Sequence, residues 1–351
     1  MMGKLKKLTG YRLFLPLSCL IIVLLINLIT TPTFFKITIN NGVLYGYIID
    51  VINRASELVV LAVGMTLVVS ASAGTDISVG AVMAVSAAVC TRVLAGGEVS
   101  VNEYANPYIL AVLAALAVAV VCGGFNGFLV AKLKIQPMVA TLILFTAGRG
   151  ISQLVTNGQI TYIRVDGYKL LGNNIPGIPI PTPIFVAVIV VALTYILLNK
   201  TAMGMYIQSV GINERASRLV GLKSVKIIWM AYAFCGLCAG IAGLVASSRI
   251  YSADANNIGL NMELDAIAAV ALGGNSLGGG RFSLLGSVIG AYTIQALTTT
   301  LYAMSVPADQ IPVYKAIVVI LIVAVQSEEL KKFRKRLASR HSSKNVEGGV
   351  A

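Results

Sequence analysis

The chain has 351 residues, of which 57% are hydrophobic and only 12% are charged. A soluble domain of this length cannot bury so much apolar surface, so lipid must cover the excess. The formal net charge of +13 would suggest nucleic acid as the partner of a soluble protein, but the basic residues gather at the two ends of the chain. We therefore predict an all-α, polytopic membrane protein in the lipid bilayer, with no nucleic-acid partner.

The first apolar run, 13–30, follows a basic N-terminal segment, 1–12. The run is too long for a signal peptide, and no small-residue cleavage site follows it, so we predict an uncleaved membrane helix. Later apolar runs lie near 58–73, 78–95, 108–131, 137–155, 184–198, 226–248, 264–274, 283–303 and 311–326. About ten transmembrane segments within 13–326 are therefore expected.

An even number of segments places both ends of the chain on the same side of the membrane. Most of the 27 lysines and arginines fall in the N-terminal segment, in alternate connections and in the basic tail, 327–351. Because basic residues are retained on the cytoplasmic side, both termini are predicted to be cytoplasmic.

One apolar run, Glu263 to Gly274, is too short to cross the membrane. About twelve helical residues cover ~18 Å of a ~30 Å hydrocarbon core, so this segment is predicted to be re-entrant or broken beside a polar cavity. A similar glycine-rich interruption occurs at 74–80. A shift of 206 residues aligns Glu57 with Glu263 and Gly74 with Gly280, which either records an internal duplication or is coincidence.

The connection from Thr156 to Pro183 is the longest on the outer side. Its four prolines exclude a helix in its second half. Either a structured extracellular cap or a plain loop fits this composition.

No catalytic or metal-binding constellation is present. Cys235 and Cys238 have a spacing seen in redox and metal sites, but no second pair accompanies them and the only histidine, His341, lies in the basic tail. We expect the five cysteines to be packing residues. The sequence G-x-x-x-x-G-K-[ST] is absent, so the chain is predicted to be neither an enzyme nor an ATPase.

The segment 211–221 lies between two membrane runs on the predicted cytoplasmic side. It is expected to form a short interfacial helix with small residues for close contact, an i, i+4 charge pair and a final glycine that lets the chain turn. A helix whose charges simply face water is the alternative. The residues proposed to couple to an ATPase are Gly211, Glu214, Ala216, Arg218 and Gly221.

Four stretches together resemble the branched-chain amino acid and ribose-type permease family of ATP-binding-cassette (ABC) importers, and 211–221 resembles the coupling helix of such permeases. They are 74–80, 134–142, 211–221, and 263–270 with 279–281. The segments 147–150 and 254–259 are most similar to galactofuranose-type sugar permeases. Thr75 departs from the family pattern, which has glycine or an apolar residue there.

The resemblance implies a permease subunit that imports a monosaccharide, galactofuranose or ribose-like, across the bacterial plasma (inner) membrane. It implies a second permease subunit, identical or paralogous, an extracytoplasmic sugar-binding protein and a separate ABC ATPase that binds ATP and Mg. This chain itself would bind no cofactor. An ion-coupled secondary transporter of a small polar solute is the alternative, and it would need mid-membrane titratable pairs.

Polar residues within apolar runs are the candidates for the substrate path, because such residues usually face a wet cavity or another helix. For Asp76 and Ser78 the alternative is helix capping, for Asn126 an interhelical hydrogen bond, and for Arg149 an ion pair with a carboxylate. The candidates are Asp76, Ser78, Asn126, Gln136, Thr141, Arg149, Gln153, Asp265, Asn275 and Gln295.

Overall fold

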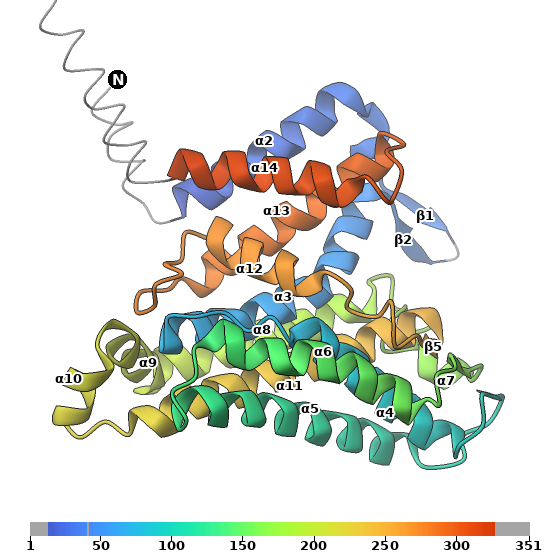
Figure 1. Ribbon diagram of the computed structural model, residues 1–351. Helices are drawn as coiled ribbons and strands as arrows, with labels where there is room; N and C mark the ends of the chain where they lie inside the picture. Colours follow the sequence, from blue (N-terminus) through green and yellow to red (C-terminus); the bar gives the residue numbers. More distant parts are fainter. Residues whose placement is uncertain (1–12, 41, 327–351) are drawn as a thin grey trace, which may run out of the picture.

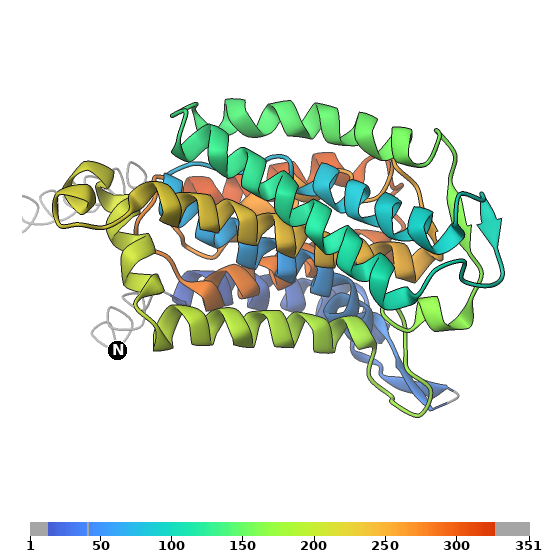
Figure 2. The same ribbon diagram turned by 90° about the horizontal axis from the view of Figure 1, so that it is seen from below.

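The computed structural model describes residues 13–40 and 42–326, and most of them form helices that run side by side (Figures 1 and 2). Helices suit a chain with this composition, because every backbone N–H and C=O within lipid must be paired inside the protein. The basic N-terminal segment 1–12 and the basic tail 327–351 lie outside the described residues.

The elements follow one another in chain order. The first part comprises α2 (Phe14–Thr30), η1 (Pro32–Phe35), the hairpin β1 (Thr38–Asn40) and β2 (Val43–Tyr45), α3 (Tyr47–Ser72), α4 (Val79–Ala95), β3 (Ser100–Val101), α5 (Tyr108–Ala131) and α6 (Pro137–Val155). The second part comprises β4 (Thr161–Ile163), α7 (Asp166–Lys169), α8 (Thr182–Lys200), α9 (Met203–Ile212), α10 (Glu214–Leu219), α11 (Ser224–Ile250), β5 (Ser252–Ala253), α12 (Met262–Leu272), α13 (Leu284–Ala303) and α14 (Ile311–Gln326). The strands gather at one end of the molecule, the strand end, and α10 lies at the other, the α10 end (Figure 1).

Six of the described helices are long and apolar enough to span a membrane, namely α3, α5, α6, α8, α11 and α13. The four other expected segments are also helices, but α2, α4, α12 and α14 have only 17, 17, 11 and 16 residues. The helical membrane fold is therefore confirmed, while ten complete crossings are not shown.

The two longest helices, α3 and α11, form the centre of the bundle. The apolar window of α3 is 89% buried within the chain, whereas those of α5, α6 and α8 are only 28% buried. Small residues let the inner helices approach closely: Gly64 of α3 faces Cys235 and Cys238 of α11, and Gly123 of α5 lies against Gly236. All five cysteines are free thiols, and Cys235 and Cys238 are packing residues, as expected.

The chain is interrupted in the same way after each central helix. The residues that follow α3 and α11, Ala73 and Tyr251, are C-caps in the left-handed conformation with φ of 52° and 56°. A largely irregular segment, 74–78 or 252–261, then separates the long helix from a shorter one. These two shorter helices are α4 and α12.

The N-terminal ends of α4 and α12 meet inside the bundle. Gly80 in the first turn of α4 lies against the carbonyl group of Gly259 and the side chain of Glu263. From this meeting point α4 leads toward the strand end and α12 toward the α10 end (Figure 1). The broken helix predicted from the short apolar run is thus present, and it has a counterpart in α4.

The two interruptions belong to a repeat with inverted direction. The series α3 to α6 starts at the strand end, whereas the series α11 to α14 starts at the α10 end (Figure 1). α5 packs against α11 and α4 as α13 packs against α3 and α12. The alignment by 206 residues paired unlike elements, because Glu57 lies within the full-length α3 and Glu263 in the first turn of α12. The structure therefore supports an internal duplication, but an inverted one.

The connection 156–183 is a structured cap. Its strand β4 pairs in parallel with β3 and antiparallel with β5. Buried Tyr168 shares a hydrogen bond of 2.7 Å with the hydroxyl of Ser247, and Ser248 donates to the carbonyl oxygen of Tyr168 at 2.5 Å. These contacts attach the cap to the end of α11.

We predict that Gly80→Ala destabilises the protein, because the new Cβ would overlap the carbonyl oxygen of Gly259. Overpacking of this kind typically costs about 1–3 kcal/mol, and thermal unfolding in detergent should show a lower midpoint. Gly150→Ala is the matched control, since no atom lies within 4 Å of a Cβ at that helical position. Equal midpoints for the two variants would contradict the close crossing of α4 and α12.

Candidate functional site

Four of the predicted polar residues form one buried network at the start of α4. Asp76 accepts hydrogen bonds from the backbone N–H of Ser78 at 2.9 Å and from its hydroxyl at 2.6 Å. Asn126 of α5 donates to the Ser78 hydroxyl at 2.8 Å, and the Thr141 hydroxyl of α6 accepts from the backbone N–H of Ile77 at 3.2 Å. The network joins α4, α5 and α6.

The polar side chains of this network bond mainly to one another and to the neighbouring backbone. The side chains of Asp76, Ser78, Asn126 and Thr141 are all buried. Asp76 holds the turn before α4 through the N–H of Ser78, whereas Ser78, at the N-cap of α4, forms no side-chain capping bond. The contact between Asn126 and Ser78 is the interhelical hydrogen bond that was the alternative for Asn126. One acceptor remains unpaired, the side-chain oxygen of Asn126.

Arg149 and Gln153 of α6 attach the segment that precedes α12. Arg149 donates from Nη1 to the carbonyl oxygens of Ala255 at 3.0 Å and Ile258 at 2.5 Å. Gln153 donates to the side-chain oxygen of Asn256 at 2.6 Å. The hydrogen-bond partners of Arg149 are therefore backbone carbonyls and not the carboxylate that its structural alternative required. Its Nη2 is buried without a partner.

A polar cavity of about 650 Å³ opens on the other side of the same segment. It contains two predicted residues, Asp265 of α12 and Gln295 of α13, together with side chains of α3 and α11. The other lining residues are the apolar Leu260 and Met262, together with Tyr47, Asp50, Arg54, Glu57, Arg249, Asn257, Thr298, Thr299 and Tyr302. A space of this size, lined by amides, hydroxyls, charges and tyrosine rings, suits a small polar solute.

Two ion pairs at this cavity were missed by the sequence analysis. Lys315 of α14 donates to both carboxylate oxygens of Asp265, at 2.9 and 2.7 Å. Arg249 pairs with Glu57 at 3.0 Å. The sequence could have indicated Lys315, because it is a cation inside the apolar run 311–326, where an ionisable residue usually has a partner or a function.

The two remaining path candidates lie at the α10 end, apart from the others. Gln136 is exposed just before α6. Asn275 is buried, donates to the carbonyl oxygen of Val270 at 2.9 Å and the hydroxyl of Ser287 at 2.7 Å, and accepts from the N–H of Ser283 at 2.5 Å. Asn275 therefore holds the connection between α12 and α13 in place.

The predicted short helix is α10, and Asn213 caps it by accepting a hydrogen bond from the N–H of Ala216 at 3.0 Å. Gly211 belongs instead to α9, where it packs against the backbone of Ser70 and Gly280. Gly221 has a φ of 86°, a conformation that glycine adopts without strain, and it turns the chain into α11.

Glu214 connects α10 to its surroundings. Its carboxylate forms ion pairs with Lys134 of the connection between α5 and α6 and with Arg218 at 2.6 Å, and accepts a hydrogen bond from Ser224 at 3.2 Å. Burial alone would raise the pKa of Glu214, but the hydrogen bond and charge of Lys134, together with the hydrogen bonds of Arg218 and Ser224, outweigh it and lower the pKa. Glu214 therefore stays ionised at neutral pH and keeps α10 attached to the bundle.

An apolar tip at α10 was not predicted. Leu219 is 90% exposed and Val220 is 77% exposed, among the highest values for large apolar side chains in the described part of the chain. Ile212, at the end of α9, is 68% exposed. Adjacent exposed apolar side chains are typical of a surface that another protein or the membrane covers.

Apolar spanning helices, the two shorter helices α4 and α12 that meet inside the bundle, and a polar cavity beside the half-helix α12 indicate a membrane transport protein. Residues 47–326 match the family described as branched-chain amino acid transport system / permease component, and the chain belongs to this family. It is a permease component, as the sequence resemblance implied.

Relatives cover nearly the whole chain. The chain is 43% identical over 327 residues to the galactofuranose transporter permease protein YtfT of Escherichia coli, covering 92% of each chain. It is 37% identical to the fructose import permease protein FruF of Bifidobacterium longum, covering 99% of this chain and 96% of the relative. It is 35% identical to the ribose import permease protein RbsC of Escherichia coli, covering 89% of this chain and 93% of the relative. No solved structure matches.

Proposed function

We propose that this chain is the membrane-spanning subunit of an ABC importer that carries a monosaccharide into the cytoplasm. The observation that carries the proposal is the polar cavity of about 650 Å³ beside the half-helix α12, in a chain that is otherwise strongly apolar. The names of the relatives, which include galactofuranose, fructose and ribose permeases, support a sugar as the solute. Galactofuranose is the first candidate, because that relative is the most similar of the three.

The sugar path would run beside the segment 254–261, between the cavity and α6. Asp265 and Gln295 are proposed to contact the sugar on the cavity side, and Arg149 and Gln153 to hold the segment from the other side. Asp76, Ser78, Asn126 and Thr141 would support the path by holding the start of α4. Gln136 and Asn275 would lie near its cytoplasmic exit.

The exposed tip of α10 is proposed to dock on a separate ABC ATPase. Leu219 and Val220 supply an apolar contact surface, and the ion pairs of Glu214 transmit movement of α10 to α5, α6 and α11. ATP and Mg would bind to that ATPase and not to this chain, which would perform no catalysis itself. Gly211 would act by packing α9 against α3.

Further partners follow from the same proposal. A second permease subunit, identical or paralogous, would complete the path, and an extracytoplasmic sugar-binding protein would dock at the strand end. Both termini would lie in the cytoplasm of a bacterial plasma (inner) membrane, on the side of α10. The ion-coupled alternative receives no support from the relatives, which are import permeases.

Purification of the tagged chain from its native membrane in mild detergent tests this function. We expect a P-loop ATPase to copurify, and its ATP turnover in proteoliposomes to rise when the binding protein and the correct sugar are added. Galactofuranose, ribose and fructose should be compared at equal concentration. A chain that purifies alone and accumulates solute only with an ion gradient would contradict the proposal.

A further inference from the structure

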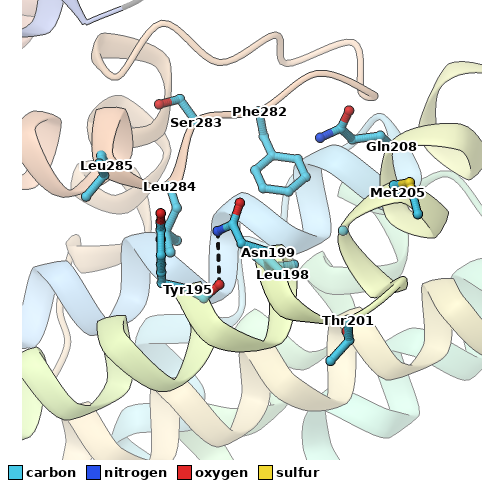
Figure 3. A pocket seen from close by; sticks show the side chains of 11 residues that line it. Tyr195, Leu198, Asn199, Thr201, Met205, Gln208, Phe282, Ser283, Leu284 and Leu285 are labelled. Carbon is cyan, nitrogen blue, oxygen red and sulfur yellow. Dashed lines mark hydrogen bonds between the residues drawn. The ribbon is translucent and has the colours of Figure 1, made fainter.

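A second polar cavity lies at the α10 end, apart from the cavity proposed for the sugar (Figure 3). Its volume is about 470 Å³, and it lies between the end of α8, the start of α9 and the segment that leads into α13. Side chains of Tyr195, Asn199, Gln208 and Phe282 surround it (Figure 3). The proposed sugar path uses none of these residues.

Several polar groups of this cavity remain available to a ligand. Asn199 donates to the carbonyl oxygen of Tyr195 at 2.9 Å, which leaves the side-chain oxygen of Asn199 free. Gln208 and the hydroxyl of Tyr195 form no hydrogen bond with any residue that the structure describes. The cavity thus offers both donors and acceptors.

Two cations are next to lining residues in the chain, although neither lines the cavity itself. Lys200 follows the lining residue Asn199, and Arg281 precedes the lining residue Phe282. Both side chains are exposed, and neither has an ion-pair partner within residues 13–40 and 42–326. No acidic residue lines the cavity, so an anionic group would meet no like charge there.

The cavity continues into an apolar groove of about 550 Å³. Tyr195 and Leu285 line both spaces. The groove runs between the spanning helices α8 and α13, with Val59 of α3 also lining it. Its other lining residues are Ala187, Val188, Val191, Ala192, Ile196, Val288 and Tyr292.

We propose that the cavity and the groove together bind one anionic phospholipid. Its phosphate would lie near Lys200 and Arg281, its glycerol esters near Tyr195, Asn199 and Gln208, and one acyl chain in the groove. Polar groups at the ends of two spanning helices, joined to an apolar channel along them, match the division of a phospholipid into headgroup and chain. A soluble sugar would leave the apolar groove empty, and a soluble peptide would have to enter the bilayer.

The site also adjoins the elements proposed to dock on the ATPase. Gln208 and Met205 lie on α9, which leads directly into α10. A lipid seated there would brace α8, α9 and α13 against one another.

Native mass spectrometry of the assembled complex, with added phosphatidylglycerol or phosphatidylcholine of the same acyl composition, tests the proposal. Each basic side chain near an anionic lipid contributes about fivefold in affinity, so two predict roughly 25-fold tighter retention of phosphatidylglycerol. The double variant Lys200→Gln with Arg281→Gln should lose this preference. Leu285→Trp, which fills the groove, should lower retention of both lipids.

Matched controls separate a specific site from the general lipid shell. Lys132→Gln removes a cation at the end of α5, away from the cavity, and Val121→Trp enlarges an exposed apolar side chain on α5. Both should retain phosphatidylglycerol as the unmodified complex does. Equal retention of the two lipids by the unmodified complex would overturn the proposal. The same holds if the cavity variants behave like the α5 controls, or if an ATPase side chain occupies the cavity in the assembled complex.

Discussion

The double variant Leu219→Asp with Val220→Asp is expected to abolish sugar-stimulated ATP turnover of the assembled complex. The two side chains are 90% and 77% exposed at the tip of α10. Two carboxylates in a desolvated apolar contact would cost several kcal/mol, because charges removed from water without partners are strongly unfavourable. At about 1.4 kcal/mol for each factor of ten, docking on the ATPase would weaken by at least a hundredfold.

Conservative variants of the same residues are the control. Leu219→Met and Val220→Ile keep an apolar surface of similar size, so stimulation should remain close to that of the unmodified complex. Folding of the permease itself should not change in the aspartate variant, since neither side chain is buried. Full stimulation with two aspartates would remove α10 from the ATPase contact and leave it as a solvated loop helix.

Arg149→Ala is expected to reduce uptake by at least tenfold per assembled complex. The variant loses two hydrogen bonds from a charged donor, to Ala255 and Ile258, and each such bond is worth about 1.5–3 kcal/mol. The segment 254–261, which carries Gly259 against Gly80, would then no longer be held against α6. Counting uptake per complex separates this effect from loss of assembly.

Arg149→Lys tests the geometry of the same site. Both carbonyl oxygens accept from the one nitrogen Nη1. An ammonium group keeps the charge and can also donate to two acceptors, but the lysine side chain is shorter and lacks the rigid guanidinium plane, so uptake should fall between that of Arg149→Ala and the unmodified complex. Restored uptake with lysine would show that charge alone matters. Unchanged uptake with alanine would make Arg149 irrelevant to the path.

Hydrophobic runs predicted nearly every helix, because length and apolar character follow directly from the thickness of the bilayer. The start of α3 is the main exception: the sequence indicated a run from about 58, whereas the helix begins at Tyr47. Asp50, Arg54 and Glu57 conceal its first turns, and the structure shows that these residues line the polar cavity. A hydropathy pattern therefore misses helical turns that carry charged residues into a polar cavity.

The candidate site was predicted as a set of residues but not as an arrangement. Four of the candidates, Asp76, Ser78, Asn126 and Thr141, lie together in a buried network. Asp265 and Gln295 line the polar cavity, and the ion pair between Asp265 and Lys315 was not predicted. Residues far apart in the sequence form each group, so spacing along the chain could not show which of them share a site.

The sequence by itself determined the membrane class, the positions of most helices and the family, because apolar length and local motifs are properties of contiguous residues. Only the tertiary structure decided that the duplication is inverted, that α4 and α12 meet at Gly80 and Gly259, and that Leu219 and Val220 are exposed. These features depend on which helices pack together. Close crossings of small residues and long-range hydrogen bonds determine that packing, and the local sequence does not show which residues of two helices become partners.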